Sequence, residues 1–171
     1  MHKTSIAVLL FGSLLQAGCG DRPPASTAAP ASTASFDTGI TTKQLMSWIT
    51  DPSAKVVFAA VATIVTEKGE EQIQPRTDEE WNVVRNNAAM VLESGNLLML
   101  EGRAKDLKAE DRNDWLDKSR ALSAAARTAI EATDVKDPEA LFTASGDIYQ
   151  ACTDCHEKYI FTPPMPGGGE Q

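Results

Sequence analysis

Helix-start signals, each followed by apolar residues at steps of three and four, divide most of this chain into predicted helices. The capping box Thr77-Asp78-Glu79-Glu80 begins one helix, and Asp137-Pro138 begins another with an N-cap and a first-turn proline. The same pairing at Asp51-Pro52 predicts that the first helix is interrupted there, with a short segment before a longer one. The predicted helices cover about residues 42–66, 77–99, 112–133 and 138–162. No segment has a strand pattern, and residues 67–71 around Gly69 are predicted to form a solvated loop.

Apolar or small residues form one stripe on each of the three later helices. The stripes are Trp81, Val84, Ala88, Val91, Gly95 and Leu98 on the second helix, and Trp115, Ser119, Leu122, Ala126 and Ala129 on the third. On the last helix three rows with a spacing of seven adjoin one another: Leu141-Ile148-Cys155, Phe142-Tyr149-His156 and Ser145-Cys152-Tyr159. We expect all three rows to face the core. Four amphipathic helices with short connections predict an all-α fold, an antiparallel up-down-up-down four-helix bundle.

The N-terminus has the features of a secretory signal. His2 and Lys3 precede the apolar stretch Ile6 to Leu15, which is too short to span a membrane in the mature protein. The following Leu15-Gln16-Ala17-Gly18-Cys19 resembles a bacterial lipobox, and this resemblance implies cleavage before Cys19 and lipidation of its thiol. The alternative is an ordinary signal peptide cut nearby, which would leave Cys19 as an exposed free thiol. We therefore expect a bacterial periplasmic protein that is anchored to a membrane at Cys19.

Composition sets the remaining boundaries. Residues after Cys19 are rich in Pro, Ala, Ser and Thr and have too few large apolar side chains to form a core. The predicted organisation is a signal peptide at 1–18, a flexible tether at 19–40, one helical domain at 41–162 and a disordered tail at 163–171.

The run Cys152-Thr153-Asp154-Cys155-His156 is typical of covalent haem attachment. Each thiol can add across a haem vinyl group to form a thioether, and the histidine then supplies an imidazole to the iron. A short disulfide and half of a zinc site are the alternatives, but a zinc site needs about four ligands and the mature chain has no second Cys/His cluster. A redox dithiol would normally begin a helix after a strand, which the sequence does not predict here. The sequence therefore predicts one covalent haem c.

In the predicted bundle, the end of the last helix lies beside the start of the first helix, the end of the second and the start of the third. This topology places the haem at one end of the bundle. It nominates as pocket residues Leu45, Met46, Ile49, Leu98, Met99 and Trp115. Lys43, Arg103 and Lys158 are near the same end, where exposed solvated side chains are the expectation over pairing with haem propionates.

A helical domain with Cys152-Thr153-Asp154-Cys155-His156-Glu157-Lys158-Tyr159 on its last helix resembles the class II c-type cytochromes, that is, cytochrome c′ and its low-spin relatives. The resemblance covers residues 41–161 and implies thioethers at Cys152 and Cys155 and an axial iron ligand at His156. Tyr159 matches the tyrosine that commonly follows the histidine in this family. Ile160 stands where a basic residue is frequent, so mechanisms that use that base are not expected here.

The sixth iron ligand separates two functions. Low-spin members of the family use a methionine on the first helix, and Met46 lies in the corresponding region, so His156/Met46 ligation would suit electron transfer. If Met46 is only a pocket wall, a five-coordinate iron would bind nitric oxide or carbon monoxide. Met99 competes with Met46 for the ligand position. A structural lipoprotein stabilised by its haem is a third interpretation, and no catalytic constellation indicates an enzyme.

The negative net charge limits the kinds of molecule that can bind this protein. The formal net charge is −8, and signal cleavage makes it −9 because Lys3 is lost. Such a surface disfavours nucleic acid and suits a basic patch on a redox partner protein, although it can also serve solubility alone. We expect redox proteins and, through the lipid, a membrane as partners, with a homodimer as a further option.

Overall fold

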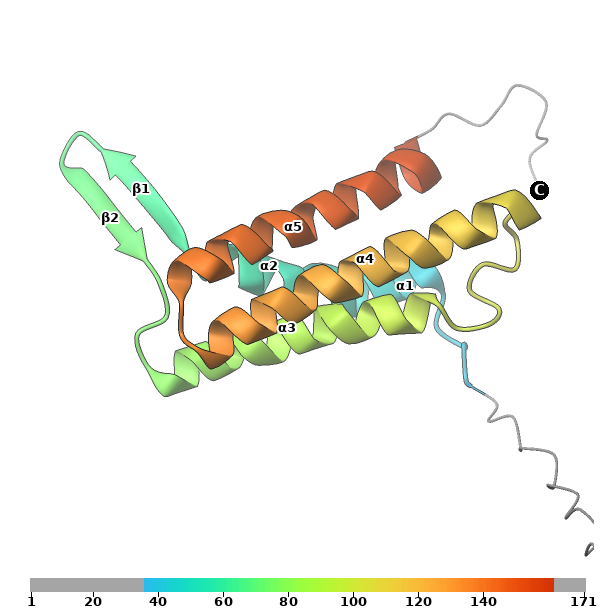
Figure 1. The fold of residues 1–171 in the computed structure, drawn as a ribbon, viewed down its shortest axis with the longest axis horizontal. Coiled ribbons are helices and arrows are strands. Elements are labelled where there is room, and N and C mark those ends of the chain that lie inside the picture. Colours follow the sequence, from blue (N-terminus) through green and yellow to red (C-terminus); the bar gives the residue numbers. More distant parts are fainter. Residues whose placement is uncertain (1–35, 162–171) are drawn as a thin grey trace, which may run out of the picture. The chain divides into compact units, whose positions relative to one another are not determined.

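The computed structural model describes residues 36–161, which form a mostly helical domain with a small two-stranded sheet (Figure 1). The predicted signal peptide, Cys19, most of the tether and the predicted tail lie outside the described residues. In the described part of the chain, no helix is both long and apolar enough to span a bilayer.

The first predicted helix is a continuous helical run of three parts: α1 (Thr42–Leu45), the π-helical segment η1 (Met46–Thr50) and α2 (Asp51–Ala59). Thr41 and Gln44 form a capping box at its start. The boundary expected at Asp51-Pro52 is present, since α2 begins at Asp51 after shorter segments. Asp51 is not an N-cap, however, and the chain stays helical across the boundary, because Asp51 has helical dihedral angles and its N–H donates to the Met46 carbonyl, five residues back. Pro52 lacks an N–H and its ring would clash with a regular preceding turn, so the wider π turn keeps the run helical.

The first helix ends earlier than the sequence predicts. Residues 60–66 leave the helix, and β1 (Ala62–Thr66) pairs antiparallel with β2 (Gly69–Ile73) in the register Val65 opposite Glu70. The expectations of a helix to Thr66 and a plain loop at 67–71 are therefore wrong. Thr63, Ile64, Val65 and Thr66 are all β-branched and favour a strand. Gly69 has a φ of +124°, which the tight turn requires and which other residues rarely adopt.

The other three predicted helices are confirmed. α3 (Asp78–Leu98) begins at Thr77, whose capping box with Glu80 is formed, and ends at Met99. α4 (Ala109–Asp134) begins three residues before its predicted start and ends one after its predicted end. α5 (Pro138–His156) is capped by Asp137, whose Oδ1 accepts hydrogen bonds from the backbone of Glu139 and Ala140, and it continues into a second π-helical segment, η2 (Glu157–Phe161).

Helix α4 packs against both α3 and α5, and α2 contacts α3 and α5, so the helices surround a common core (Figure 1). Every residue of the predicted stripes on α3 and α4 is buried. Gly95 allows the closest approach, because a Cβ there would lie 2.2 Å from Ser123 Oγ and 2.7 Å from the Ser119 carbonyl. On α5 one prediction fails: Phe142 and Tyr149 are exposed, so the row that leads to His156 borders the core instead of facing it.

Candidate cofactor site at the end of α5

A small cavity lies where the end of α5 meets η1, α3 and α4. It is lined from η1 by Met46 and Thr50, from α3 by Leu98, from α4 by Lys118, Ser119 and Leu122, and from α5 by Ala151, Cys152, Cys155 and His156. The structure thus brings the Cys-x-x-Cys-His motif to one cavity with Met46 and Leu98, which are more than 50 residues away along the chain. The cavity wall is almost wholly apolar.

The geometry of η1 determines how Met46 reaches this cavity. Met46 is the first residue of the π turn, and the Thr50 hydroxyl, which is buried, donates to the Leu45 carbonyl at 3.3 Å. Leu45 itself is fully buried in the core and does not line the cavity. Met46 packs half-buried against that core. Met46 thus lies in the π turn at the border of the core and lines the same cavity as the motif.

The two thiols are free and half-buried. Burial raises the pKa of Cys152, and electrostatic interactions with Cys155 and Asp51 raise it further. Burial also raises the pKa of Cys155, against the lowering effect of Lys118. A redox dithiol usually has a lowered pKa and sits at a helix N-terminus, whereas these thiols have raised pKa values near a helix C-terminus. The environment therefore disfavours the dithiol interpretation and is compatible with thioether formation.

His156 completes the motif at the last position of α5. Its ring is half-buried, lines the cavity, and lies edge-on to Phe161 with ring centroids 6.3 Å apart. Cys152 and His156 are separated by one helical turn, so the thiols and the imidazole share one side of the helix. One side of α5 can therefore offer both sulfurs and a nitrogen to the same group.

The other nominated residues lie near the cavity without lining it. Trp115 is buried, donates from Nε1 to the Leu98 carbonyl at 2.9 Å, and packs edge-on against Tyr159 with centroids 5.1 Å apart. Ile49 packs against the core. Met99 lines a different cavity, with Gly102 and Leu116 among its neighbours. In this structure, then, Met46 shares the cavity with His156 and Met99 does not.

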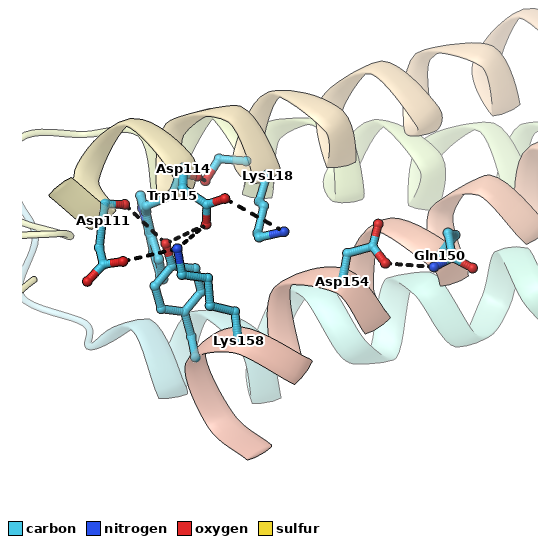
Figure 2. A network of polar contacts seen from close by, with 9 residues as sticks. Asp111, Asp114, Trp115, Lys118, Gln150, Asp154 and Lys158 are labelled. Carbon is cyan, nitrogen blue, oxygen red and sulfur yellow. Dashed lines mark hydrogen bonds and ion pairs between the residues drawn. The ribbon is translucent and has the colours of Figure 1, made fainter. Parts of the chain in front are cut away.

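A polar network, which we call the α4–α5 latch, was not predicted. It consists of Asp111 and Asp114 on α4 and Lys158 and Tyr159 on η2 (Figure 2). The Tyr159 hydroxyl donates to Asp114 Oδ2 at 2.8 Å and lies 3.1 Å from the Asp111 carbonyl oxygen. Lys158 Nζ lies 3.0 Å from Asp111 Oδ1 and 3.1 Å from Asp114 Oδ2. Lys158 is exposed, as expected, but it pairs with two carboxylates instead of being only solvated.

The latch shifts the titration of its members. Burial, the hydrogen bond to Asp114 and the negative charge of that carboxylate raise the pKa of Tyr159 to about 12. Burial would raise the pKa of Asp114, but hydrogen bonds from Tyr159 and Lys158 outweigh it and lower the pKa overall. Hydrogen bonds to Asp111 and Asp114 raise the pKa of Lys158. Near neutral pH the latch therefore combines a carboxylate pair, an ammonium and a neutral phenol.

Of the other cations named from the sequence, Arg103 is half-buried and donates from Nη1 to the Ile40 carbonyl, so it is not freely solvated. Lys43 is exposed, as expected. The cation that lines the cavity is Lys118, which the sequence analysis missed. Its position three residues after Trp115 on a helix whose start adjoins the motif is the signal that could have identified it.

The donor set fits a haem c, since two thiols, an imidazole and a thioether meet beside apolar Leu98, Leu122 and Ala151. The cavity is narrow, with a volume of about 20 Å³, so a haem requires the end of α5 to lie farther from α4 and η1 than it does here. Within residues 36–161, no group of three or more His, Cys, Asp or Glu side chains could hold a metal ion, so these residues offer no zinc site of that kind. In comparisons with known proteins, no protein-family model, no curated protein and no solved structure matches this chain.

Proposed function

We propose that this chain is a lipid-anchored c-type cytochrome of class II that carries electrons on one covalent haem c. The observation that supports it most strongly is the shared cavity of Met46, Cys152, Cys155 and His156. In this proposal the helices form the antiparallel four-helix bundle of that class, with the haem at the end where α5 stops.

Each side chain has a distinct role. The Cys152 and Cys155 thiols would hold the haem, each through a carbon–sulfur bond to one vinyl group, with the thiol proton taken up by the other vinyl carbon. His156 and Met46, which line the same cavity, would supply an imidazole and a thioether as ligands to the iron. The bound haem supplies a one-electron ferric/ferrous couple, and a histidine–methionine pair raises its potential. Leu98 and Leu122 keep water from the iron, which limits reorganisation when the electron moves.

The membrane and the partner follow from the flanking sequence and the charge. Cleavage before Cys19 and acylation of its thiol would anchor the domain on the periplasmic side of a membrane, with residues up to 40 as a tether. A net charge of −9 after cleavage suits a redox partner with a basic surface. The Cys19→Ser variant should then move from the membrane fraction to the soluble periplasmic fraction.

Spectra of the purified protein test the electron-transfer role. The ferric protein should be low-spin and show the weak sulfur-to-iron charge-transfer band in the far red. Met46→Ala should abolish the band, lower the reduction potential and open the iron to carbon monoxide, because the thioether favours the ferrous state. Met99→Ala is the matched control and should keep the band, since Met99 lines another cavity.

One observation favours a second candidate, a five-coordinate module that binds nitric oxide or carbon monoxide. Apart from Met46, the wall of the cavity includes Leu98 and Leu122, whose apolar side chains would admit a small uncharged gas. A wild-type protein that is high-spin and binds carbon monoxide readily would establish this candidate and reduce Met46 to a pocket wall.

A further inference from the structure

Among the residues that line the cavity at the end of α5, Lys118 is the one Lys, Arg, Asp or Glu side chain that the structure describes. It projects from α4 one turn after Asp114, and its side chain is only 23% exposed. Because partial removal of an ammonium group from water costs free energy, an anionic partner would stabilise Lys118 at this cavity.

Lys118 forms an ion pair with Asp114, but their contact is long. Lys118 Nζ lies 4.0 Å from Asp114 Oδ1, beyond hydrogen-bond distance. The other oxygen of Asp114 already accepts from the Tyr159 hydroxyl at 2.8 Å and lies 3.1 Å from Lys158 Nζ (Figure 2). Asp114 therefore contacts Tyr159 and Lys158 more closely than Lys118, and its contact with Lys118 is the longest of the three.

Lys118 lines the same cavity as Cys155 and His156 of the attachment motif. Lys158 is held by two carboxylates at 3.0 and 3.1 Å, Arg103 donates to the Ile40 carbonyl, and Lys43 is exposed outside the cavity. Of these four cations, Lys118 is the one at the cavity wall whose amine can turn to a new partner.

We infer that Lys118 is the cation that pairs with a haem propionate. This inference rests on the proposed function, because it requires haem c at Cys152 and Cys155. Rotation of the flexible lysine side chain carries Nζ from Asp114 to the propionate, and Asp114 remains neutralised by Lys158 and Tyr159. The long contact with Asp114 is then the position of the Lys118 amine before it pairs with the propionate. Moving the amine costs little free energy, because Asp114 keeps its contacts with Lys158 and Tyr159.

The test compares holoprotein variants. Lys118→Gln removes the charge and Lys118→Arg keeps it. Lys136→Gln removes an equal charge just beyond the other end of α4, where Lys136 pairs with Asp78 at 2.6 Å. The measurements are the covalent haem content by mass, the midpoint potential, and the propionate-bending band in the resonance Raman spectrum. The band reports hydrogen bonding to the propionate, which a lysine with a merely structural role would not alter.

Lys118→Gln should shift the propionate band and lower the midpoint potential. Removal of a positive charge near the haem makes the ferric state more stable relative to the ferrous state. Lys118→Arg should restore both readouts, and Lys136→Gln should match the wild type. A Lys118→Gln protein that holds haem and matches the wild type in both readouts overturns the inference and leaves the proposed function intact. Wild-type protein without covalent haem, made in a host that attaches haem c, instead overturns the proposed function.

If Lys118→Gln does not fold, a crystal structure of the wild-type holoprotein decides. Lys118 Nζ within about 4 Å of a propionate oxygen, the usual limit for an ion pair, bears out the inference. A Lys118 amine that remains beside Asp114, with no propionate in reach, refutes it.

Discussion

The two halves of α5 are held in different ways. From Pro138 to Ile148 the helix buries Leu141, Ala144, Ser145 and Ile148 against its neighbours. After Ile148 no residue of α5 or η2 is fully buried. The second half instead places half-buried thiols and an imidazole beside the small cavity, and the α4–α5 latch holds its end. Interdigitated apolar side chains fix the first half, whereas a few polar contacts fix the second.

The difference indicates where the fold allows rearrangement. A close-packed core resists a change of even one methylene group, whereas half-buried side chains around a cavity can move at small cost. Both candidate iron ligands lie where helical geometry changes: Met46 begins η1, and His156 is the last residue before η2. π-helical turns occur frequently at functional sites. The first half of α5 is thus fixed by core packing, and the second half is the part of the helix that can move more easily.

The largest expected effect lies in the second half of α5. Replacing both thiols, Cys152→Ala with Cys155→Ala, should eliminate covalent haem completely, because no carbon–sulfur bond can form. The helical circular dichroism should remain, since half-buried side chains contribute only about 1 kcal/mol or less to folding. Intact mass after acid and organic extraction measures the haem. Haem retained through that extraction by the double variant would contradict thioether attachment.

In the first half of α5, Ile148→Ala should lower the free energy of unfolding by about 2–5 kcal/mol, because it leaves a cavity at a fully buried site. Denaturant unfolding of the same preparations measures the difference. The matched control is Phe142→Ala on the same helix, where the side chain is 63% exposed and the change should stay within about 0.5 kcal/mol. Equal losses of unfolding free energy in the two variants would contradict the assignment of Ile148 to the core and Phe142 to the surface.

The contact between α3 and α4 at Gly95 can show whether the tight packing of the core extends to the cavity. Gly95→Ala should lower the free energy of unfolding by about 1–3 kcal/mol, because its Cβ would meet the Ser119 carbonyl at 2.7 Å. Ser119 itself lines the cavity. Gly146→Ala on α5 is the control, since a Cβ there has open space and should stabilise the helix by about 0.5–1 kcal/mol. If Gly95→Ala leaves the free energy of unfolding unchanged, α3 and α4 can move apart at this contact.

Helical periodicity and capping chemistry were sufficient to predict most of the domain. The capping box at Thr77 and the proline after Asp137 act locally, so the starts of α3 and α5 follow from neighbouring residues alone. The hairpin was missed although the β-branched run from Thr63 to Thr66 is visible in the sequence. The exposure of Phe142 was missed because a spacing of seven places residues in one row without giving the angle of that row to the core.

The candidate site could be predicted only in part, for a different reason. The motif names Cys152, Cys155 and His156 directly, and topology brings Met46 to the same end. Which methionine enters the cavity depends on the π turn at Met46 and on the end of α3 at Met99, neither of which a spacing reveals. Lys118 depends on side-chain pairing between distant segments, as does the latch, so neither has a signature in the local sequence.

The smallest expected effect concerns the latch. Tyr159→Phe removes the hydroxyl that donates to Asp114 and should lower the free energy of unfolding by about 0.5–1.5 kcal/mol near neutral pH. Asp114 keeps Lys158 as a partner, so no carboxylate is left unpaired. The effect should therefore stay below that of Ile148→Ala.

The pH dependence of the same variant identifies the phenol as the source of the effect. The pKa of Tyr159 is raised from an ordinary value of 10.0 to about 12 in the folded protein, so the folded state binds this proton more tightly than the unfolded state does. Its contribution is complete below pH 10.0 and is lost as the pH rises towards about 12. Lys158, whose pKa is also raised, adds an alkaline loss that both proteins share. Denaturant unfolding from neutral to alkaline pH should show the wild-type advantage over Tyr159→Phe shrinking across this window. A constant, non-zero difference would contradict the raised pKa of Tyr159. No difference at any pH would mean that Tyr159 stabilises the end of α5 through its ring alone, by packing edge-on against Trp115, because phenylalanine keeps that ring.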